Sequence, residues 1–164
     1  MEDQAATLLA ALKKPSTAVD TRLQLFTDLK SNIKHSRVSE AAQGPIFECI
    51  RIAISASTSA ALVAQGFSTL SHFIKRLALQ AETHILTANS HKLLPLLLDR
   101  LGDARESHRH AAAQLLGDLY PLCQAEVETL IRDNAMKGAN PRAKETSMHW
   151  LVKVGDTAAC RAND

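Results

Sequence analysis

Histidine and cysteine are the residue types in this sequence that could bind a metal ion or supply a nucleophile, and the chain has seven and three of them. His108 and His110 stand two positions apart, which places their side chains on different faces of a helix. The sequence has no HExxH motif and no group of His and Cys at zinc-ligand spacing. Cys49, in FECIRI, falls within an apolar helical pattern and is expected in the core. The sequence therefore predicts no metal site.

Catalytic motifs are missing from the sequence as well. It has no GxSxG elbow, no P-loop and no GxGxxG turn. No pair of acidic residues stands out from what a solvated helix face would carry. We therefore expect a non-enzymatic protein that needs no cofactor.

A different chemistry is suggested by KGANPRAK, residues 137–144, which carries Lys137, Arg142 and Lys144 and no acidic residue. Such a segment could face an acidic macromolecule, or its charges could simply be solvated. Asn140 followed by proline is typical of the N-terminus of a helix. The segment is thus predicted to be a turn that leads into a helix.

Helical periodicity marks the elements that would position this turn. The expected helices are 1–12, 17–33, 45–54, 58–79, 93–101, 105–119, 125–136 and 141–154, with a separate short turn at 81–88. The clearest apolar stripe consists of Val63, Phe67, Leu70, Ile74 and Leu77. Ser16 or Thr17 is expected to cap the second helix, and Pro45 is expected in the first turn of the third. No segment alternates as a strand would.

The helices form candidate pairs, whose second members begin near residues 16, 57, 104 and 141. An interval of about 40 residues is typical of HEAT and armadillo repeats, in which each pair packs on the next. The sequence thus predicts an all-α, HEAT-type solenoid of about four antiparallel helix pairs. A plain globular helical bundle remains the alternative.

Charge is distributed unevenly between the two kinds of turn in such a stack. The turns within pairs are 13–19, 55–60, 102–107 and 137–144, and their net charge is +4. The turns between pairs are 34–40, 80–92 and 123–127, and their charges cancel. This asymmetry favours an acidic partner along the edge formed by the first set, with solvated loop charge as the alternative.

Composition sets outer limits on function and location. The net charge of +2 is too small to predict nucleic-acid or membrane binding. The N-terminus does not resemble a signal peptide, and no apolar run approaches the ~18 residues of a membrane span. Three widely spaced cysteines are expected to be reduced thiols of an intracellular protein. Trp150 is expected in the core, whereas Lys75 and Arg76 are either solvated or part of a second contact surface.

Several stretches resemble a known family: KHSRVSEAA (34–42), GFSTLSHFIKRLALQ (66–80), LLPLLLDRLGDARE (93–106) and NPRAKETSMHWLV (140–152). They are similar to the N-terminal region of the CLASP (Orbit/MAST) microtubule-associated proteins, and the fungal members look closest. The resemblance covers residues from about 5 to 154. It implies a TOG-like domain, a flat paddle of helix pairs whose turns within each pair face tubulin.

The resemblance also implies a function, a location and a site. The expected function is regulation of microtubule dynamics and the mitotic spindle, with tubulin, microtubules or kinetochore proteins as partners. The expected location is the cytoplasm, the cytoskeleton and the spindle, and the nucleus in closed mitosis. The partner-binding residues that we expect in the four turns are Lys13, Lys14, Ser16, Ser57, Thr58, Arg105, Lys137, Asn140, Arg142 and Lys144.

Two departures from the family pattern keep other interpretations open. TOG domains that grip tubulin usually carry an aromatic residue, commonly Trp, in the first turn, and KKPSTAVDTR (13–22) has none. A kinetochore or cortex scaffold that does not bind tubulin is therefore the alternative to a tubulin-binding domain. An enzyme or a nucleic-acid-binding helical repeat is the third hypothesis. TOG domains usually have about six helix pairs, so we expect a fragment, an isoform or a truncated gene product. Residues 1–154 are predicted to form a partial domain and 155–164 a polar, disordered tail.

Overall fold

The computed structural model describes residues 1–56 and 59–161, and every element among them is helical. The chain divides into two compact units, Met1–Asn89 and Ser90–Asp164. In the part of the chain that is described, no strand is present, which confirms the all-α class. None of the described helices is both long enough and apolar enough to cross a bilayer.

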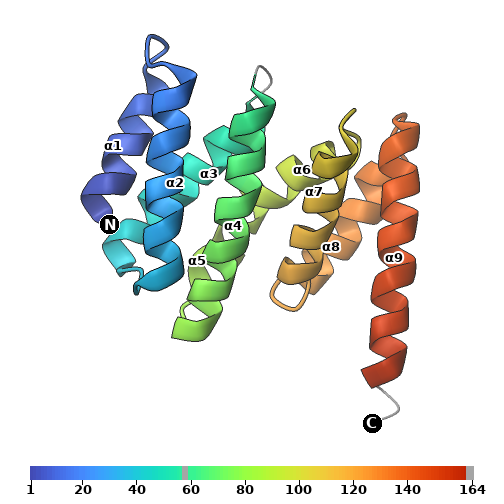
Figure 1. The fold of residues 1–164 in the computed structure, drawn as a ribbon. Helices are drawn as coiled ribbons and strands as arrows, with labels where there is room; N and C mark the ends of the chain where they lie inside the picture. The colour runs from blue at the N-terminus through green and yellow to red at the C-terminus, as the bar shows by residue number, and fades with distance from the viewer. Residues whose placement is uncertain (57–58, 162–164) are drawn as a thin grey trace. The chain divides into compact units, whose positions relative to one another are not determined.

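The first unit consists of two antiparallel helix pairs and a short helix (Figure 1). Its helices are α1 (Glu2–Lys13), α2 (Val19–His35), α3 (Glu40–Ser55), α4 (Ala60–Gln80) and α5 (His84–Ala88). Within the pairs, α1 contacts α2 and α3 contacts α4; between the pairs, α1 packs on α3 and α2 on α4. The C-terminal ends of α1 and α3 therefore lie at the same edge of this unit as the N-terminal ends of α2 and α4.

The core of this unit is built from the apolar stripe predicted on α4. All five stripe residues are buried: Val63, Phe67, Leu70, Ile74 and Leu77. The helix begins where the Ser59 hydroxyl accepts a hydrogen bond from the Leu62 amide, and it ends at Ala81, whose φ of 57° is left-handed. The Glu82 amide then bonds the Leu77 carbonyl, which closes the helix as in a Schellman motif.

The second unit holds the other two helix pairs. Its elements are α6 (Ser90–Leu101), α7 (Glu106–Leu119), α8 (Gln124–Leu130), the π-helical segment η1 (Ile131–Ala135) and α9 (Pro141–Arg161). The α6 helix contacts α7, α8 and α9, and it buries five leucines: Leu93, Leu94, Leu97, Leu98 and Leu101. The two units together thus contain the four helix pairs expected from the sequence.

Several predicted helix ends were wrong. The α2 N-cap is Ala18, without a side-chain hydrogen bond, so neither Ser16 nor Thr17 caps it. Helix α3 begins at Glu40 and runs through Pro45, because packing that buries Ala42 and Gln43 offsets the missing proline N–H.

Two further differences concern the second unit. The helix expected at 125–136 is split into α8 and a π-helical turn. Helix α9 continues to Arg161, seven residues beyond the expected end. The disordered tail predicted for 155–164 stays a prediction at 162–164, which lie outside the described residues.

Candidate partner-binding turns

The first turn within a pair is held in place by Arg22 of α2. Its guanidinium donates to three carbonyls of the preceding helix end and turn, those of Ala11 (3.2 Å), Lys14 (2.8 Å) and Pro15 (3.4 Å). The backbone is therefore braced while the predicted residues Lys13, Lys14 and Ser16 remain exposed. Arg22 is not among the residues predicted from the sequence. The available signal was a cation in the first turn of a helix, where the macrodipole disfavours it unless it reaches carbonyls elsewhere.

The second turn is only partly described. The predicted residues Ser57 and Thr58 lie outside the described residues. Ser59, which follows them, serves as the N-cap of α4. The candidate site in the first unit therefore rests on the first turn.

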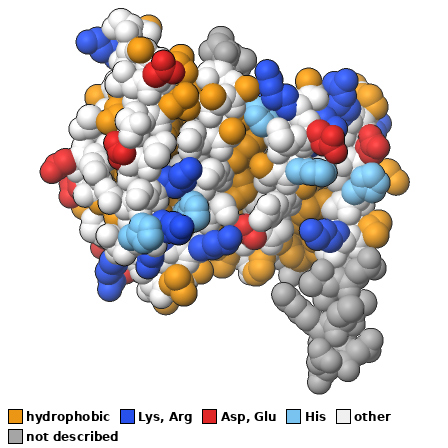
Figure 2. All heavy atoms as spheres, viewed as in Figure 1, with side chains coloured by type: hydrophobic (Ala, Val, Ile, Leu, Met, Phe, Trp, Pro, Cys, Tyr) orange, Lys and Arg blue, Asp and Glu red, His pale blue; other side chains and the backbone are white. Residues whose placement is uncertain are grey.

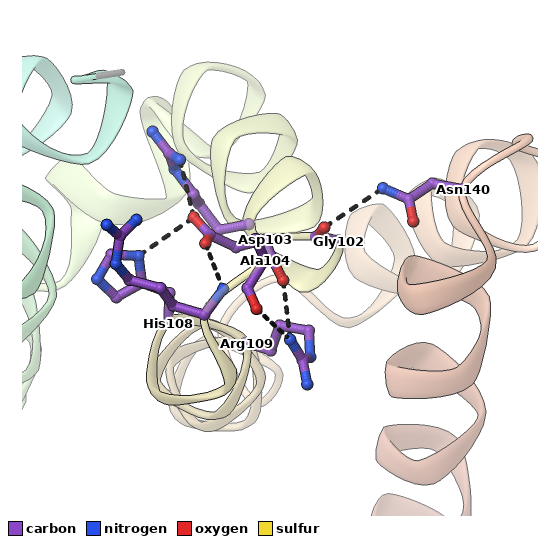
Figure 3. A network of polar contacts seen from close by, with 8 residues as sticks. Gly102, Asp103, Ala104, His108, Arg109 and Asn140 are labelled. Atoms are coloured by element: carbon purple, nitrogen blue, oxygen red, sulfur yellow. Dashed lines mark hydrogen bonds and ion pairs between the residues drawn. The ribbon is translucent and has the colours of Figure 1, made fainter. Parts of the chain in front are cut away.

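The third turn is organised around Asp103, whose side chain is only 8% exposed (Figure 3). Its Oδ2 accepts from Arg100 Nη1 at 3.0 Å and lies 3.1 Å from His108 Nδ1, and its Oδ1 accepts from the Arg105 amide at 2.9 Å. Burial raises the pKa of Asp103, but these three hydrogen bonds outweigh it, so the pKa lies below its ordinary value. Asp103 is thus a structural carboxylate that is charged at neutral pH.

A second brace fixes the backbone of the same turn. Arg109 Nη1 donates to the carbonyls of Asp103 (2.9 Å) and Ala104 (3.1 Å), as Figure 3 shows. The predicted residue Arg105 lies on this braced segment and is exposed. Its guanidinium makes no hydrogen bond or ion pair with any other described side chain. The Asp103 carboxylate is paired with Arg100 inside the fold. The exposed charge of the third turn is therefore more positive than the sum of its charged residues, and Arg105 supplies its positive part.

The third and fourth turns are joined through Asn140. Its Oδ1 accepts from the Arg142 and Ala143 amides (3.0 and 3.3 Å), which confirms it as the N-cap of α9, and its Nδ2 donates to the Gly102 carbonyl at 3.4 Å. A Cβ atom on Gly102 would lie 2.1 Å from that Nδ2, so only glycine allows this approach. The two turns of this unit therefore lie side by side (Figure 3).

The cations of the fourth turn are not equivalent. Lys137 Nζ bonds Asp133 Oδ1 at 2.8 Å, and Arg132 bonds the same carboxylate. Hydrogen bonds from Arg132 and Lys137 lower the pKa of Asp133 to about 2. Arg142 is exposed and Lys144 is half-buried. Arg142 is therefore the most available cation of this turn, whereas the charge of Lys137 is partly compensated.

The structure thus gathers the predicted residues into two groups. One comprises Lys13, Lys14 and Ser16 in the first unit, and the other comprises Arg105, Lys137, Asn140, Arg142 and Lys144 in the second. We call the second group the α6–α9 turn surface. Its backbone is braced by residues that were not predicted from the sequence, chiefly Asp103 and Arg109.

A groove of about 970 Å³ between α7 and α9 was not anticipated. Glu106 and His110 line it from α7, and Glu145 and His149 line it from α9.

Trp150 is 4% exposed, which confirms it as a core residue. Across the described residues, no three His, Cys, Asp or Glu side chains are placed to hold a metal ion.

Comparison with known proteins gives a consistent result. The sequence model of the family described as CLASP N terminal matches residues 1–161. Protein STU1 of Phaeosphaeria nodorum is 69% identical over 157 residues, which are 96% of this chain and 13% of that protein. Protein stu1 of Aspergillus oryzae is 46% identical over 154 residues, which are 94% of this chain and 13% of that protein. The chain therefore spans a small part of the length of these relatives.

A solved structure supports the fold. The crystal structure of the MAST/Orbit N-terminal domain matches with a TM-score of 0.74 at 22% identity, covering 89% of this chain and 63% of that chain. This likeness confirms the all-α, HEAT-type solenoid predicted from the helix pairs and the TOG-like fold that the family resemblance implies. The match of the family model to residues 1–161 shows that the chain belongs to the CLASP N-terminal family.

Proposed function

We propose that this chain is a non-enzymatic binding domain of a CLASP-type regulator of microtubule dynamics and the mitotic spindle. In this proposal it contacts tubulin, or another spindle partner, through the turns within its helix pairs. The observation that supports this most is the α6–α9 turn surface, where exposed Arg105 and Arg142 stand on a backbone braced by Asp103, Arg109 and Asn140.

The mechanism follows from preorganisation and charge. Because the turns are already fixed by hydrogen bonds, binding would cost little loop ordering. Exposed guanidinium and ammonium groups would steer an acidic surface and add modest affinity, and both effects would weaken as salt rises. A salt-sensitive complex is therefore expected, with Arg142 as the strongest single contributor.

The test is charge reversal at Arg142 and Lys144, made together as Arg142→Glu and Lys144→Glu. Both positions lie in the first turns of α9, where acidic side chains suit the helix dipole, so the fold should persist. We expect the variant to lose co-migration with tubulin in gel filtration at low salt. The matched control is Lys92→Glu made together with Lys153→Glu, which reverses two exposed lysines outside the turns. Equal co-migration of wild type and double variant would refute the turn surface as the tubulin site.

A scaffold that does not bind tubulin is the second candidate, and one observation favours it. The first turn exposes Lys13, Lys14 and Ser16 and offers no aromatic side chain. Aromatic anchors commonly dominate the binding energy of protein interfaces, and hydrogen bonds do not easily replace them. Recovery of a kinetochore or cortical protein by this chain, with no tubulin bound at any salt concentration, would choose this candidate.

A further inference from the structure

A cationic patch lies on the first unit, at the end of α2 and α4 that is opposite the turns within the pairs. It consists of Lys30 and Lys34 of α2 with His72, Lys75 and Arg76 of α4, and we call it the α2/α4 cationic face. All five residues belong to the C-terminal halves of their helices. Figure 2 shows Lys, Arg and His side chains gathering over this part of α2 and α4.

Hydrogen bonds between the two helices hold part of this face in place. Lys30 Nζ donates to Gln65 Oε1 at 3.1 Å and to Ser68 Oγ at 3.3 Å. Arg76 donates from Nε to the Ile33 carbonyl at 2.9 Å, and from Nη2 to the Lys34 carbonyl. Lys34 and Lys75 are exposed beside these anchored groups. The face thus combines a fixed frame with two available ammonium groups.

The positive charges of this face are not neutralised within the fold. Helix α4 contains no Asp or Glu among its 21 residues. The described ion pairs of the first unit are Arg37–Glu82 and Arg51–Glu48, and neither involves the face. Burial lowers the pKa of His72, and the charges of Lys30, Lys34 and Lys75 lower it further. The imidazole therefore experiences a net positive field that an anion would relieve.

The side chains of the face favour an acidic polypeptide over single-stranded nucleic acid, because no aromatic side chain described on α2 or α4 is available to stack on bases. The Arg76 guanidinium donates to backbone carbonyls through Nε and Nη2, so it is not available for a bidentate contact with a carboxylate or a phosphate. The aromatic side chains of α2 and α4, Phe26, Phe67 and Phe73, are buried and offer no platform for stacking bases. The groups that remain available are the exposed ammonium groups of Lys34 and Lys75 and the third N–H of the anchored Lys30. Lysine ammonium groups act as point charges.

Spacing indicates the shape of the partner. Lys30 and Lys34 lie one helical turn apart, a rise of about 6 Å. Alternate residues of an extended chain are separated by about 6.6 Å and point to the same side. We propose that the α2/α4 cationic face binds an extended acidic segment of another polypeptide, whose alternate carboxylates follow α2 and reach Lys75. This surface is separate from the turns of the proposed function and does not depend on tubulin binding.

The test uses a fluorescein-labelled oligoglutamate peptide and fluorescence anisotropy at about 50 mM and about 300 mM salt, because exposed ion pairs are screened over this range. We expect the double variant Lys34→Glu, Lys75→Glu to bind the peptide at least about tenfold more weakly at low salt. The matched control is Lys92→Glu, Lys153→Glu, which makes the same charge change at two exposed lysines outside the α2/α4 cationic face and the α6–α9 turn surface. Equal loss in both variants would overturn the proposal, since binding would then reflect net charge alone.

Two further readouts make the result specific. Both substituted lysines are exposed, so unchanged circular dichroism and melting temperature should show that the fold persists. In wild type, NMR should show the pKa of His72 rising when the peptide binds; an unchanged pKa in a saturated complex would place the peptide elsewhere. A single-stranded DNA oligomer of equal charge that binds as tightly through the same lysines would overturn the polypeptide assignment. Peptide binding that persists in the Arg142→Glu, Lys144→Glu variant would separate this face from the turn surface.

Discussion

Replacing Asp103 with asparagine tests the central claim about the candidate site, that a buried carboxylate organises the third turn. The amide keeps an oxygen for the Arg105 amide but removes the charge that Arg100 and His108 face. Asp103→Asn therefore removes the charge, and because the NH₂ group takes the place of Oδ2, it also removes the acceptor of the Arg100 hydrogen bond. It changes no volume that the surrounding helices must accommodate.

The magnitude follows from the hydrogen bonds. A bond to a charged group contributes about 1.5–3 kcal/mol, whereas a neutral bond contributes about 0.5–1.5 kcal/mol. The charge-assisted bond from Arg100 to Asp103 Oδ2 is lost and the contact with His108 loses its charge, so the free energy of unfolding should fall by about 2 kcal/mol at pH 7. Asp103→Ala also removes the acceptor of the Arg105 amide and should cost about 3 kcal/mol.

The pH dependence gives an independent check of sign. The folded-state pKa of Asp103 lies below the ordinary value of 3.8. The stability from the charged carboxylate is therefore complete above that value and is lost as pH falls through the folded-state pKa. The difference between wild type and Asp103→Asn should accordingly persist from pH 7 to about pH 5 and shrink at lower pH.

Urea unfolding followed by tryptophan fluorescence provides the assay. Trp150 is the single tryptophan of the chain and is buried in the same unit as Asp103, so its signal reports unfolding of that unit. The control is Asp99→Asn, an exposed aspartate of α6, which should change stability by less than about 0.5 kcal/mol. A loss below about 0.5 kcal/mol for Asp103→Asn, or a loss that does not vary with pH, would refute the reasoning.

Three further predictions concern the first unit and the thiols. Gly66→Ala should destabilise the protein by about 1–3 kcal/mol in thermal unfolding, because its Cβ would lie 3.0 Å from side-chain atoms of α3 and 3.2 Å from a backbone nitrogen. The control is Gly44→Ala, which should stabilise slightly because a Cβ there would meet nothing within 4 Å. Equal effects of the two substitutions would contradict this packing. Ala81→Gly should stabilise by about 0.5–1 kcal/mol because it relieves a left-handed alanine, and a lower melting temperature would count against that strain. Burial raises the pKa of the Cys49 thiol to about 12, and burial also raises the pKa of Cys123, so neither should be alkylated by iodoacetamide at pH 8 in the folded protein. Peptide mapping that finds rapid modification without denaturant would contradict their burial.

Much of the helical fold could be predicted because side-chain periodicity is a local property. The α4 stripe from Val63 to Leu77 is buried as its spacing required. Asn140 caps α9 because an amide oxygen at that position reaches two amides of its own first turn. The exact ends were harder, since Pro45 sits inside α3 where packing outweighs the lost hydrogen bond.

The candidate site was only half predictable. Charge counts identified the exposed cations of the turns, such as Lys14 and Arg142. They did not identify Arg22, Asp103 or Arg109, because these side chains act through acceptors and donors that only folding brings near. The available signals were Arg22 in the first turn of a helix and Asp103 directly after a glycine. Neither signal identifies the group to which the side chain bonds.

The sequence by itself determined the helical class, the four pairs, the apolar faces and the family resemblance, because each follows from local spacing or from matching residues. The tertiary structure alone decided which charges face outward and which are consumed inside the fold. Asp103 and Arg142 are both charged residues beside a helix start, yet one is nearly buried as a structural hub and the other is exposed. The physical reason is that a side chain's burial and its hydrogen-bond partners depend on the neighbouring helices that pack against it, and spacing along one helix does not encode them.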